Sequence, residues 1–231
     1  MASQSPVDRS PDKTITIAAL KYALSKMGMD KQTLKDKQEA AIMSILDGKD
    51  TMVILPTGYG KSLVYQVAPL STDFIRHSTD CSCDQLSHVE QKSIAVVISP
   101  LIALMSDQVN DLRQKGISAV NVATVRSDEE RKLLQEGKFS VVFATPESLL
   151  KSGTGLLHLT VYRENVCGIF VDEGHCVAKW YVHFIFFPPS LLHMLVSRKM
   201  DLKNYLSLSE SEKTSSSNSK CKCPKWSLLY H

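Results

Sequence analysis

The sequence feature that most constrains the fold is an apolar run at residues 51–55 that stops at Pro56 and is followed by two closely spaced glycines. A continuous apolar run of this length predicts a buried strand of a parallel sheet, and a helical pattern resumes at Lys61. A strand, a glycine-rich turn and a helix in this order form a phosphate loop. The residues predicted to surround a bound nucleotide there are Thr57, Gly58, Tyr59, Gly60, Lys61 and Ser62.

Each part of this loop has a physical role in binding phosphate. Gly58 and Gly60 lack side chains, so the backbone is expected to approach the ligand closely. The first amides of the following helix favour an anion, because they have no partner within the helix and lie at its positive end. Lys61 is predicted to reach the β- and γ-phosphates, and Ser62 to hold Mg²⁺. The general motif has Gly at position 55, where this chain has Leu.

A second motif follows another apolar run, at residues 167–171, and consists of Asp172 and Glu173. Ligands of open parallel sheets bind at the carboxyl ends of the strands. Asp172 is predicted to complete the Mg²⁺ shell, and Glu173 to orient and deprotonate the attacking water. Alone, the first motif could be an ordinary strand–helix turn and the second a solvated strand end. Together, and in this order, they predict a site that binds and hydrolyses a nucleotide.

Composition adds only broad limits. The 231 residues are 43% hydrophobic and 22% charged, which suits one sizeable core. A net charge of +3 is too small to identify a nucleic-acid partner. The six cysteines accompany no secretory signal, so we expect reduced thiols. A zinc site built from Cys81, Cys83, Cys221 and Cys223 is disfavoured by the tight spacing. Segment 182–196 is too short and too broken by Pro and His to cross a membrane, so no membrane partner is expected.

Alternating helical and strand patterns predict an α/β fold with a doubly wound parallel sheet. Helices are expected at 14–27, 34–46, 61–70, 102–115 and 128–135. Strands are expected at 51–55, 94–99, 119–123, 141–144 and 168–171. The predicted organisation is a disordered N-terminus at 1–12, one ATP-binding lobe at 13–180 with a polar insertion near 71–92, and a divergent, largely unstructured tail at 181–231.

Four further blocks carry a family resemblance, at 34–38, 99–108, 144–147 and 172–180. With the phosphate loop, their order and spacing resemble the first motor lobe of RecQ-family DNA helicases of superfamily 2, which has a RecA-like fold and a DEAH-like box. That family usually lacks Gly at the first loop position, in agreement with Leu55. Tyr59 resembles the Werner-type branch.

The resemblance implies roles for particular residues. Lys61, Asp172, Glu173 and His175 would be catalytic, with His175 coupling the ATP site to the DNA-binding face. Gln38 would read the adenine edge, although it could be an exposed helix glutamine. The DNA-binding residues would be Pro100, Leu101, Thr145, Pro146 and Trp180. The first four could instead end strands in simple turns, and Trp180 could be a buried packing residue rather than a base-stacking one.

The resemblance also implies an ATP-dependent 3′-to-5′ DNA helicase. Its cofactors would be ATP and Mg²⁺, and its partners single-stranded DNA and duplex junctions. The protein would be located in the nucleus and would act in DNA repair and recombination. The family has an aromatic residue at 34 and Arg at 35, whereas this chain has Leu34 and Lys35.

The resemblance stops at Trp180, and no second lobe or arginine finger is recognisable after it. The abrupt change suggests an alternative transcript, a retained intron or a faulty gene model. We expect a truncated first lobe that binds nucleotide weakly and does not unwind DNA. A strand beside the phosphate-loop strand should be missing, leaving an exposed sheet edge. The alternative is a non-enzymatic nucleotide- and DNA-binding fragment or regulatory isoform, while a transporter-type or kinase-type phosphate-loop protein is disfavoured.

Overall fold

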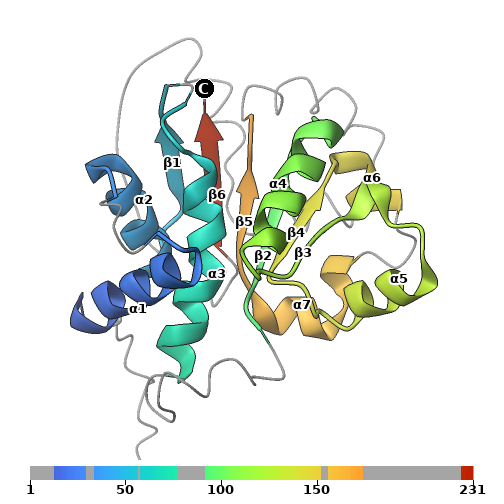
Figure 1. Cartoon of the computed structure of the whole chain (residues 1–231), viewed down its shortest axis with the longest axis horizontal. Helices are drawn as coiled ribbons and strands as arrows, with labels where there is room; N and C mark the ends of the chain where they lie inside the picture. Colours follow the sequence, from blue (N-terminus) through green and yellow to red (C-terminus); the bar gives the residue numbers. More distant parts are fainter. Residues whose placement is uncertain are drawn as a thin grey trace, which may run out of the picture. The chain divides into compact units, whose positions relative to one another are not determined.

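The computed structural model describes residues 13–29, 34–56, 58–77, 92–151, 156–173 and 225–230. All of them belong to one compact unit, which the chain enters twice, before Gly174 and again after Cys223. The unit contains a parallel sheet flanked by helices (Figure 1). This architecture confirms the predicted RecA-like α/β fold.

The sheet has six described strands in the order β1-β6-β5-β2-β4-β3, and every neighbouring pair is parallel. The strands are β1 (Thr51–Ile54), β2 (Ile94–Ile98), β3 (Ala119–Asn121), β4 (Val141–Ala144), β5 (Val166–Val171) and β6 (Lys225–Tyr230). Because all strands run in one direction, their carboxyl ends meet at one edge of the sheet. That edge receives both motifs identified in the sequence.

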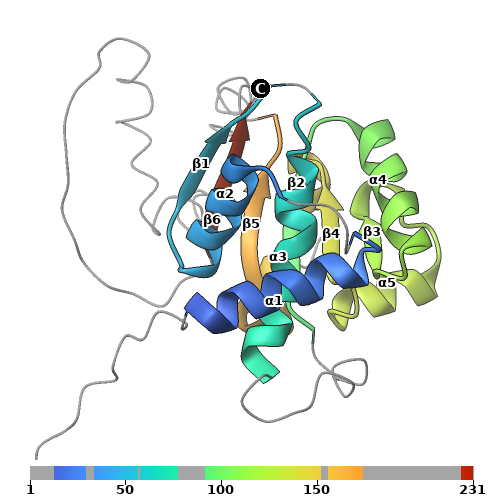
Figure 2. The ribbon, with the colours of Figure 1, turned by 60° about the vertical axis from the view of Figure 1, so that its left-hand side comes forward.

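The first five of the seven described helices follow the predicted order. The seven helices are α1 (Lys13–Lys26), α2 (Asp36–Leu46), α3 (Ser62–His77), α4 (Ile102–Gln114), α5 (Asp128–Gln135), α6 (Pro146–Lys151) and α7 (Thr160–Asn165), with short 3₁₀ turns η2 (Val122–Thr124) and η3 (Leu156–His158). Helix α1 lies across α3, and α2 lies beside β1 (Figures 1 and 2). None of the described helices is long and apolar enough to span a bilayer.

Three features differ from the sequence-based expectation. Helix α3 continues to His77, so the segment predicted as a polar insertion from Ser71 begins as helix. The sequence did not predict α6 and α7. The third difference concerns the sheet: β6 pairs with both β1 and β5, so β1 is not left without the neighbour that we expected to be missing. The six residues of β6 come from the segment that we predicted to be a divergent tail.

The core lies between α3 and the middle of the sheet. All five residues of β2 are buried, and Phe143 of β4 and Phe170 of β5 have 1% and no exposure. Val64 and Val67 of α3 are also completely buried. Burial of such side chains contributes about 1.5–3 kcal/mol each. The core therefore fixes α3 over the strands that carry the two motifs.

Candidate nucleotide-binding site

The phosphate-loop segment joins β1 to the N-terminus of α3, as the apolar run and the glycines predicted. Gly58 and Gly60 have φ values of +76° and +89°, a conformation that suits residues without a Cβ. Ser62 is the first residue of the 16-residue helix α3, so the positive end of the helix dipole lies at the loop. Lys61 precedes it, and its Nζ donates a hydrogen bond to the Leu55 carbonyl at 3.4 Å.

Gln38 fixes the shape of this loop. Its side-chain Nε2 donates to the carbonyls of Tyr59 and Gly60 at 3.0 and 2.9 Å, and its Oε1 accepts from the Lys35 N–H at 3.0 Å. The residue is only 5% exposed, so the alternative of an exposed helix glutamine is wrong. In this structure its amide binds the loop backbone. Its contact with adenine stays a prediction.

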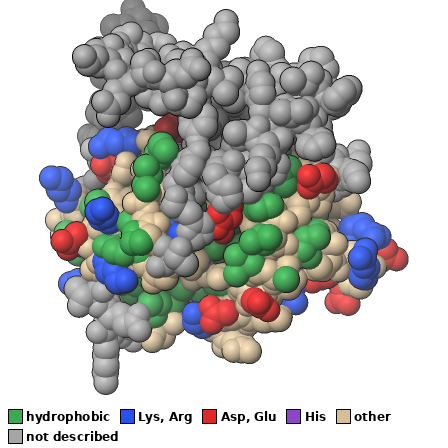
Figure 3. All heavy atoms as spheres, turned by 90° about the horizontal axis from the view of Figure 1, so that it is seen from above, with side chains coloured by type: hydrophobic (Ala, Val, Ile, Leu, Met, Phe, Trp, Pro, Cys, Tyr) green, Lys and Arg blue, Asp and Glu red, His purple; other side chains and the backbone are tan. Residues whose placement is uncertain are grey.

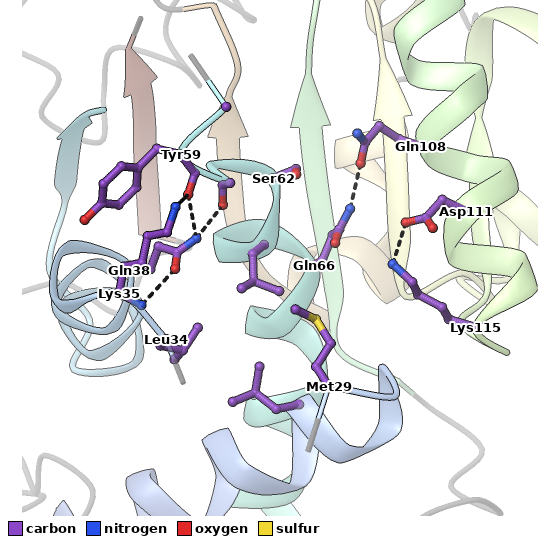
Figure 4. Close-up of a pocket in the computed structure, with 14 residues that line it drawn as sticks. Met29, Leu34, Lys35, Gln38, Tyr59, Ser62, Gln66, Gln108, Asp111 and Lys115 are labelled. Atoms are coloured by element: carbon purple, nitrogen blue, oxygen red, sulfur yellow. Dashed lines mark hydrogen bonds and ion pairs between the residues drawn. The ribbon is translucent and has the colours of Figure 1, made fainter. Parts of the chain in front are cut away.

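Lys35 and Tyr59 form a second contact between α2 and the loop. The Lys35 ammonium lies 4.3 Å from the centre of the Tyr59 ring and donates to the Tyr59 carbonyl at 3.2 Å (Figure 4). A cation over an aromatic face is attracted by the ring quadrupole, by about 0.5–1 kcal/mol at an exposed site. Lys35 therefore keeps a cation at the position where the resembled family has Arg.

Asp172 and Glu173 lie directly after β5 and are 9% and 8% exposed, so the reading of a solvated strand end is wrong. The Asp172 N–H donates to the Ile98 carbonyl at 2.9 Å, and this hydrogen bond extends the pairing of β5 with β2. Glu173 has φ of +58°, and its N–H donates to Asp172 Oδ1 at 3.1 Å. A non-glycine residue in this conformation costs about 1–3 kcal/mol and is most often found at functional sites.

Tyr65 connects the two motifs, and the sequence did not identify it. It lies one turn after Ser62 on α3 and is 2% exposed, and its ring packs against Phe143 of β4 and Phe170 of β5. Burial raises the pKa of Tyr65 well above its ordinary value of 10.0, and the negative charge of Asp172 raises it further. Tyr65 therefore packs the start of α3 against β5, the strand that precedes Asp172. The only available signal was an aromatic residue three positions after the loop serine.

A cavity of about 350 Å³ adjoins the loop, between the N-terminus of α2, α3 and α4 (Figure 4). Gln66 of α3 donates to Gln108 of α4 at 2.6 Å across one wall. The lining residues are Leu24, Met29, Leu34, Lys35, Gln38, Gly58, Tyr59, Gly60, Ser62, Leu63, Gln66, Gln108, Asp111 and Lys115. Its size and its mixture of apolar and polar walls suit a small organic ligand. Gln108 belongs to the family-like block at residues 99–108. No feature of the sequence indicated that Met29 or Gln66 would line a cavity.

The predicted DNA-binding residues fall into two groups at the carboxyl ends of the strands. Leu101 is 52% exposed, and its neighbours Ile102 and Leu104 are 48% and 38% exposed, whereas Pro100 is partly buried. Figure 3 shows hydrophobic side chains among charged ones on the described part of this face, with Lys and Arg scattered at its rim.

Thr145 and Pro146 begin α6. The Thr145 Oγ1 accepts from the Ser148 N–H at 3.0 Å, and the Ser148 Oγ accepts from the Thr145 N–H at 2.9 Å. Pro146 occupies the first helical position, where its missing N–H costs nothing. These contacts give both residues a structural role in starting a helix. Thr57, His175 and Trp180 lie outside the described residues.

The described residues contain no group of three or more His, Cys, Asp or Glu side chains that could hold a metal ion. The predicted magnesium ligands are instead one hydroxyl, of Ser62, and one carboxylate, of Asp172. Oxygen donors of this kind fit Mg²⁺, which usually binds one or two protein groups together with substrate phosphates and water. The donor set therefore fits the ion that the sequence predicted.

The parallel sheet, the glycine-rich turn before α3 and the buried carboxylates after β5 define a lobe of the RecA-like class. A sequence profile described as DEAD/DEAH box helicase matches residues 35–199. The chain is 31% identical over 153 residues to "ATP-dependent DNA helicase RecQ" of Haemophilus influenzae, covering 64% of this chain and 21% of that protein. It is 33% identical over 150 residues to "ATP-dependent helicase wrn-1" of Caenorhabditis elegans, covering 63% of this chain and 12% of that protein.

The chain therefore belongs to the DEAD/DEAH box helicase family. Its similarity to RecQ-type helicases confirms the resemblance seen in the sequence. The chain spans about a fifth or less of the length of these curated relatives. The crystal structure of the DUF1998 helicase MrfA bound to DNA and AMPPNP has a similar fold, with a TM-score of 0.54 and 20% identity over 98% of this chain and 27% of that chain.

Proposed function

We propose that this chain is the ATP-binding lobe of a RecQ-type 3′-to-5′ DNA helicase that couples ATP hydrolysis to strand separation. The observation that carries the proposal is the meeting of the two motifs at one edge of the sheet. Ser62 begins α3, Asp172 directly follows β5, and α3 packs against β5. An anion-binding helix end next to buried carboxylates is the arrangement that phosphoryl transfer requires.

Each residue of the site has a distinct role in this proposal. The amides that begin α3 and the Lys61 ammonium bind the β- and γ-phosphates. Ser62 and Asp172 hold Mg²⁺, which neutralises charge on those phosphates. Glu173 orients a water and accepts its proton. His175 would couple the nucleotide site to DNA. Gln38, already bound to the loop carbonyls, would transmit the presence of a base to the loop.

The same edge of the sheet would bind a DNA strand. Pro100, Leu101, Thr145 and Pro146 follow β2 and β4, and Trp180 would add a base-stacking surface. Contacts from backbone and hydroxyl groups to phosphate position a strand without reading its sequence. The crystal structure of MrfA, whose fold is similar, was determined with DNA. Single-stranded DNA and duplex junctions in the nucleus are therefore the proposed substrates.

Strand separation in such motors comes from opening and closing a cleft between two lobes around ATP. The described residues form one lobe. We therefore expect such a lobe, tested alone, to bind nucleotide without unwinding DNA. A strand-displacement assay on the purified chain, with a full-length RecQ protein as the positive control, checks this expectation.

Nucleotide binding is tested by thermal unfolding of the purified chain with and without Mg²⁺-ATP. Ligand at about 100 times Kd adds roughly 2.7 kcal/mol to the stability of a folded lobe. Lys61→Ala should lose this increment. The control is Lys49→Ala, which removes a similar ammonium group that is 67% exposed and paired with Asp47. This variant should keep the nucleotide-dependent increment. An equal increment in Lys61→Ala and in the unmodified chain would contradict the proposed site.

A further inference from the structure

The cavity beside the phosphate loop is the place that a nucleobase would enter if the triphosphate bound at the start of α3. It borders Gly58, Tyr59 and Gly60 of the loop and lies between α2, α3 and α4 (Figure 4). Bases differ mainly in the hydrogen-bond donors and acceptors on their edges, whereas every base has a π-face that can stack. The base selectivity of the cavity therefore depends on which polar groups of its wall can still bind a ligand.

The Gln38 amide is already committed to the protein. Its NH₂ group donates to the Tyr59 and Gly60 carbonyls at 3.0 and 2.9 Å, and its oxygen accepts the Lys35 N–H at 3.0 Å. The amide has no third hydrogen to donate, so a base could receive a hydrogen bond from Gln38 only if a loop carbonyl gave one up. Such an exchange replaces one hydrogen bond by another and leaves a carbonyl unpaired, so it adds little to the free energy of binding.

Other polar side chains of the cavity wall are paired in the same way. Gln66 Nε2 donates to Gln108 Oε1 at 2.6 Å, and the Lys115 ammonium donates to Asp111 Oδ2 at 2.7 Å. Apolar side chains also line the cavity, and they belong to Leu24, Met29, Leu34 and Leu63. An apolar wall can contact any base but cannot strongly reject one. The wall therefore offers a nucleobase more contact area than hydrogen-bonding selectivity.

We propose that this site selects the triphosphate and discriminates weakly among bases, so that its ligands are nucleoside triphosphates as a class. The inference rests on the proposed nucleotide-binding function and defines the range of its ligands. Gln38 is a positioning residue in this proposal: it fixes the loop and responds to the presence of a base without distinguishing which base it is. A site built to hydrogen-bond its ligand rejects an analogue by about 10⁴–10⁵-fold, whereas an apolar pocket rejects one by about 10²-fold or less.

The first test compares ligands on the unmodified chain by calorimetric titration in the presence of Mg²⁺. The probes are the non-hydrolysable β,γ-imido analogues of ATP and GTP, together with inorganic triphosphate, which has no base. We expect the Kd values of the two analogues to lie within about tenfold of each other. A larger preference for either analogue overturns the inference and leaves the proposed function standing. Failure of all three probes to bind overturns both.

The second test is Gln38→Ala, which removes both hydrogen bonds from this side chain to the loop carbonyls. It should weaken the binding of all three probes by the same factor, about tenfold, because the loop loses its support whatever the ligand. The result with inorganic triphosphate is decisive, since this ligand has no base for Gln38 to contact. A loss confined to the adenine analogue would show that Gln38 reads the base, and would overturn the inference.

The matched control is Asn165→Ala, which also removes a buried side-chain amide. Asn165 is 6% exposed, its Nδ2 donates to the Val161 carbonyl at 2.9 Å, and its Oδ1 accepts from Arg76 near the C-terminal end of α3. This variant should keep the Kd values of the unmodified chain for all three probes. Equal losses in Gln38→Ala and Asn165→Ala reject the positioning role of Gln38. The comparison of ligands needs no variant, so it decides the inference even if Gln38→Ala does not fold.

Discussion

The two ends of α3 contact the rest of the molecule in different ways. At the N-terminal end, before Ser62, the chain uses two glycines with positive φ and adjoins a cavity. At the C-terminal end, Asp73 Oδ1 accepts a hydrogen bond from the Ser93 N–H at 2.6 Å, and the Arg76 guanidinium contacts Asn165 Oδ1 at 3.4 Å. These bonds connect the helix to the segments that begin β2 and β5.

The charge of Asp73 at the C-terminal end of α3 also acts on Cys167 of β5. Burial and, to a smaller extent, this charge raise the pKa of the Cys167 thiol to about 12. A thiol with such a pKa is unreactive at neutral pH. Cys167 is a free cysteine.

The difference indicates a division of labour along one helix. Hydrogen bonds that end within the protein stabilise the C-terminal end, while the N-terminal end is the proposed phosphate-binding site. Changes at the C-terminal end should therefore lower stability without altering ligand binding. Changes at the N-terminal end should weaken ligand binding with little effect on stability. The following substitutions test this comparison.

The largest effect is expected from Gly60→Ala, compared with Gly58→Ala. Both positions have positive φ, which costs about 1–2 kcal/mol for alanine. Only at Gly60 would the new Cβ lie 2.7 Å from Gln38 Nε2; at Gly58 it meets nothing within 4 Å. Gly60→Ala should remove the nucleotide-dependent stabilisation, roughly 2.7 kcal/mol at about 100 times Kd, and Gly58→Ala should keep most of it. Calorimetric titration with Mg²⁺-ATP measures both; equal losses would show that Gln38 does not fix the loop.

The next effect belongs to the C-terminal end. Asp73→Ala leaves the buried Ser93 N–H without its acceptor and should lower the free energy of unfolding by about 1–3 kcal/mol. Urea denaturation measures this loss, and the affinity for nucleotide should stay unchanged. Asp73→Asn retains an acceptor oxygen and should lose much less. A change in nucleotide affinity in either variant would weaken the comparison between the two ends.

The pH dependence of Asp73→Asn sharpens the same test. Burial raises the pKa of Asp73 above its ordinary value of 3.8, although the Ser93 N–H partly opposes the rise. Between 3.8 and the raised value the folded chain binds more protons than the unfolded chain, so this group's contribution to stability falls as pH rises. The stability of the unmodified chain relative to Asp73→Asn should therefore decrease across that window. An increase would show that the carboxylate is favoured by folding.

The smallest effect is expected at Lys35, which is exposed. Lys35→Met removes the cation from the Tyr59 ring and should cost less than about 1 kcal/mol of stability. Lys35→Arg keeps a cation over the ring and should restore most of the loss. Thermal unfolding without ligand compares the two variants. Equal stability of Lys35→Met and the unmodified chain would mean that Gln38 alone holds α2 to the loop.

Much of the sheet could be predicted because its strands are buried on both faces. Continuous apolar runs such as 94–98 and 141–144 have few alternatives when a turn residue or a helical pattern bounds them. The phosphate loop and the position of Asp172 followed from the same runs. The contacts of Gln38 and Tyr65 could not be predicted, because they depend on which side chains the folded strands bring together.

Other elements depend on packing that the local sequence does not contain. We expected α3 to end at residue 70, where a polar segment begins, but the helix continues to His77 with Pro69 inside it. The helix continues because its next turn packs on α1: Ser71 is completely buried, and its hydroxyl contacts the Ala19 carbonyl at 3.5 Å. Helix α6 follows from the reciprocal bonds of Thr145 and Ser148. From the sequence we expected a DNA-binding loop or a simple turn at this place.

The position of β6 has a consequence for the speed of folding. Ser227 pairs with Thr51 on one side and with Phe170 on the other, so most of the chain separates the first pair in sequence. Contacts between such distant segments form slowly, because a long loop must close before any pairing can offset its entropy. The strands after β1 can pair through shorter connections, and β1 should join them late. Refolding should therefore be slow and should have a late phase in which the two motifs reach their final separation.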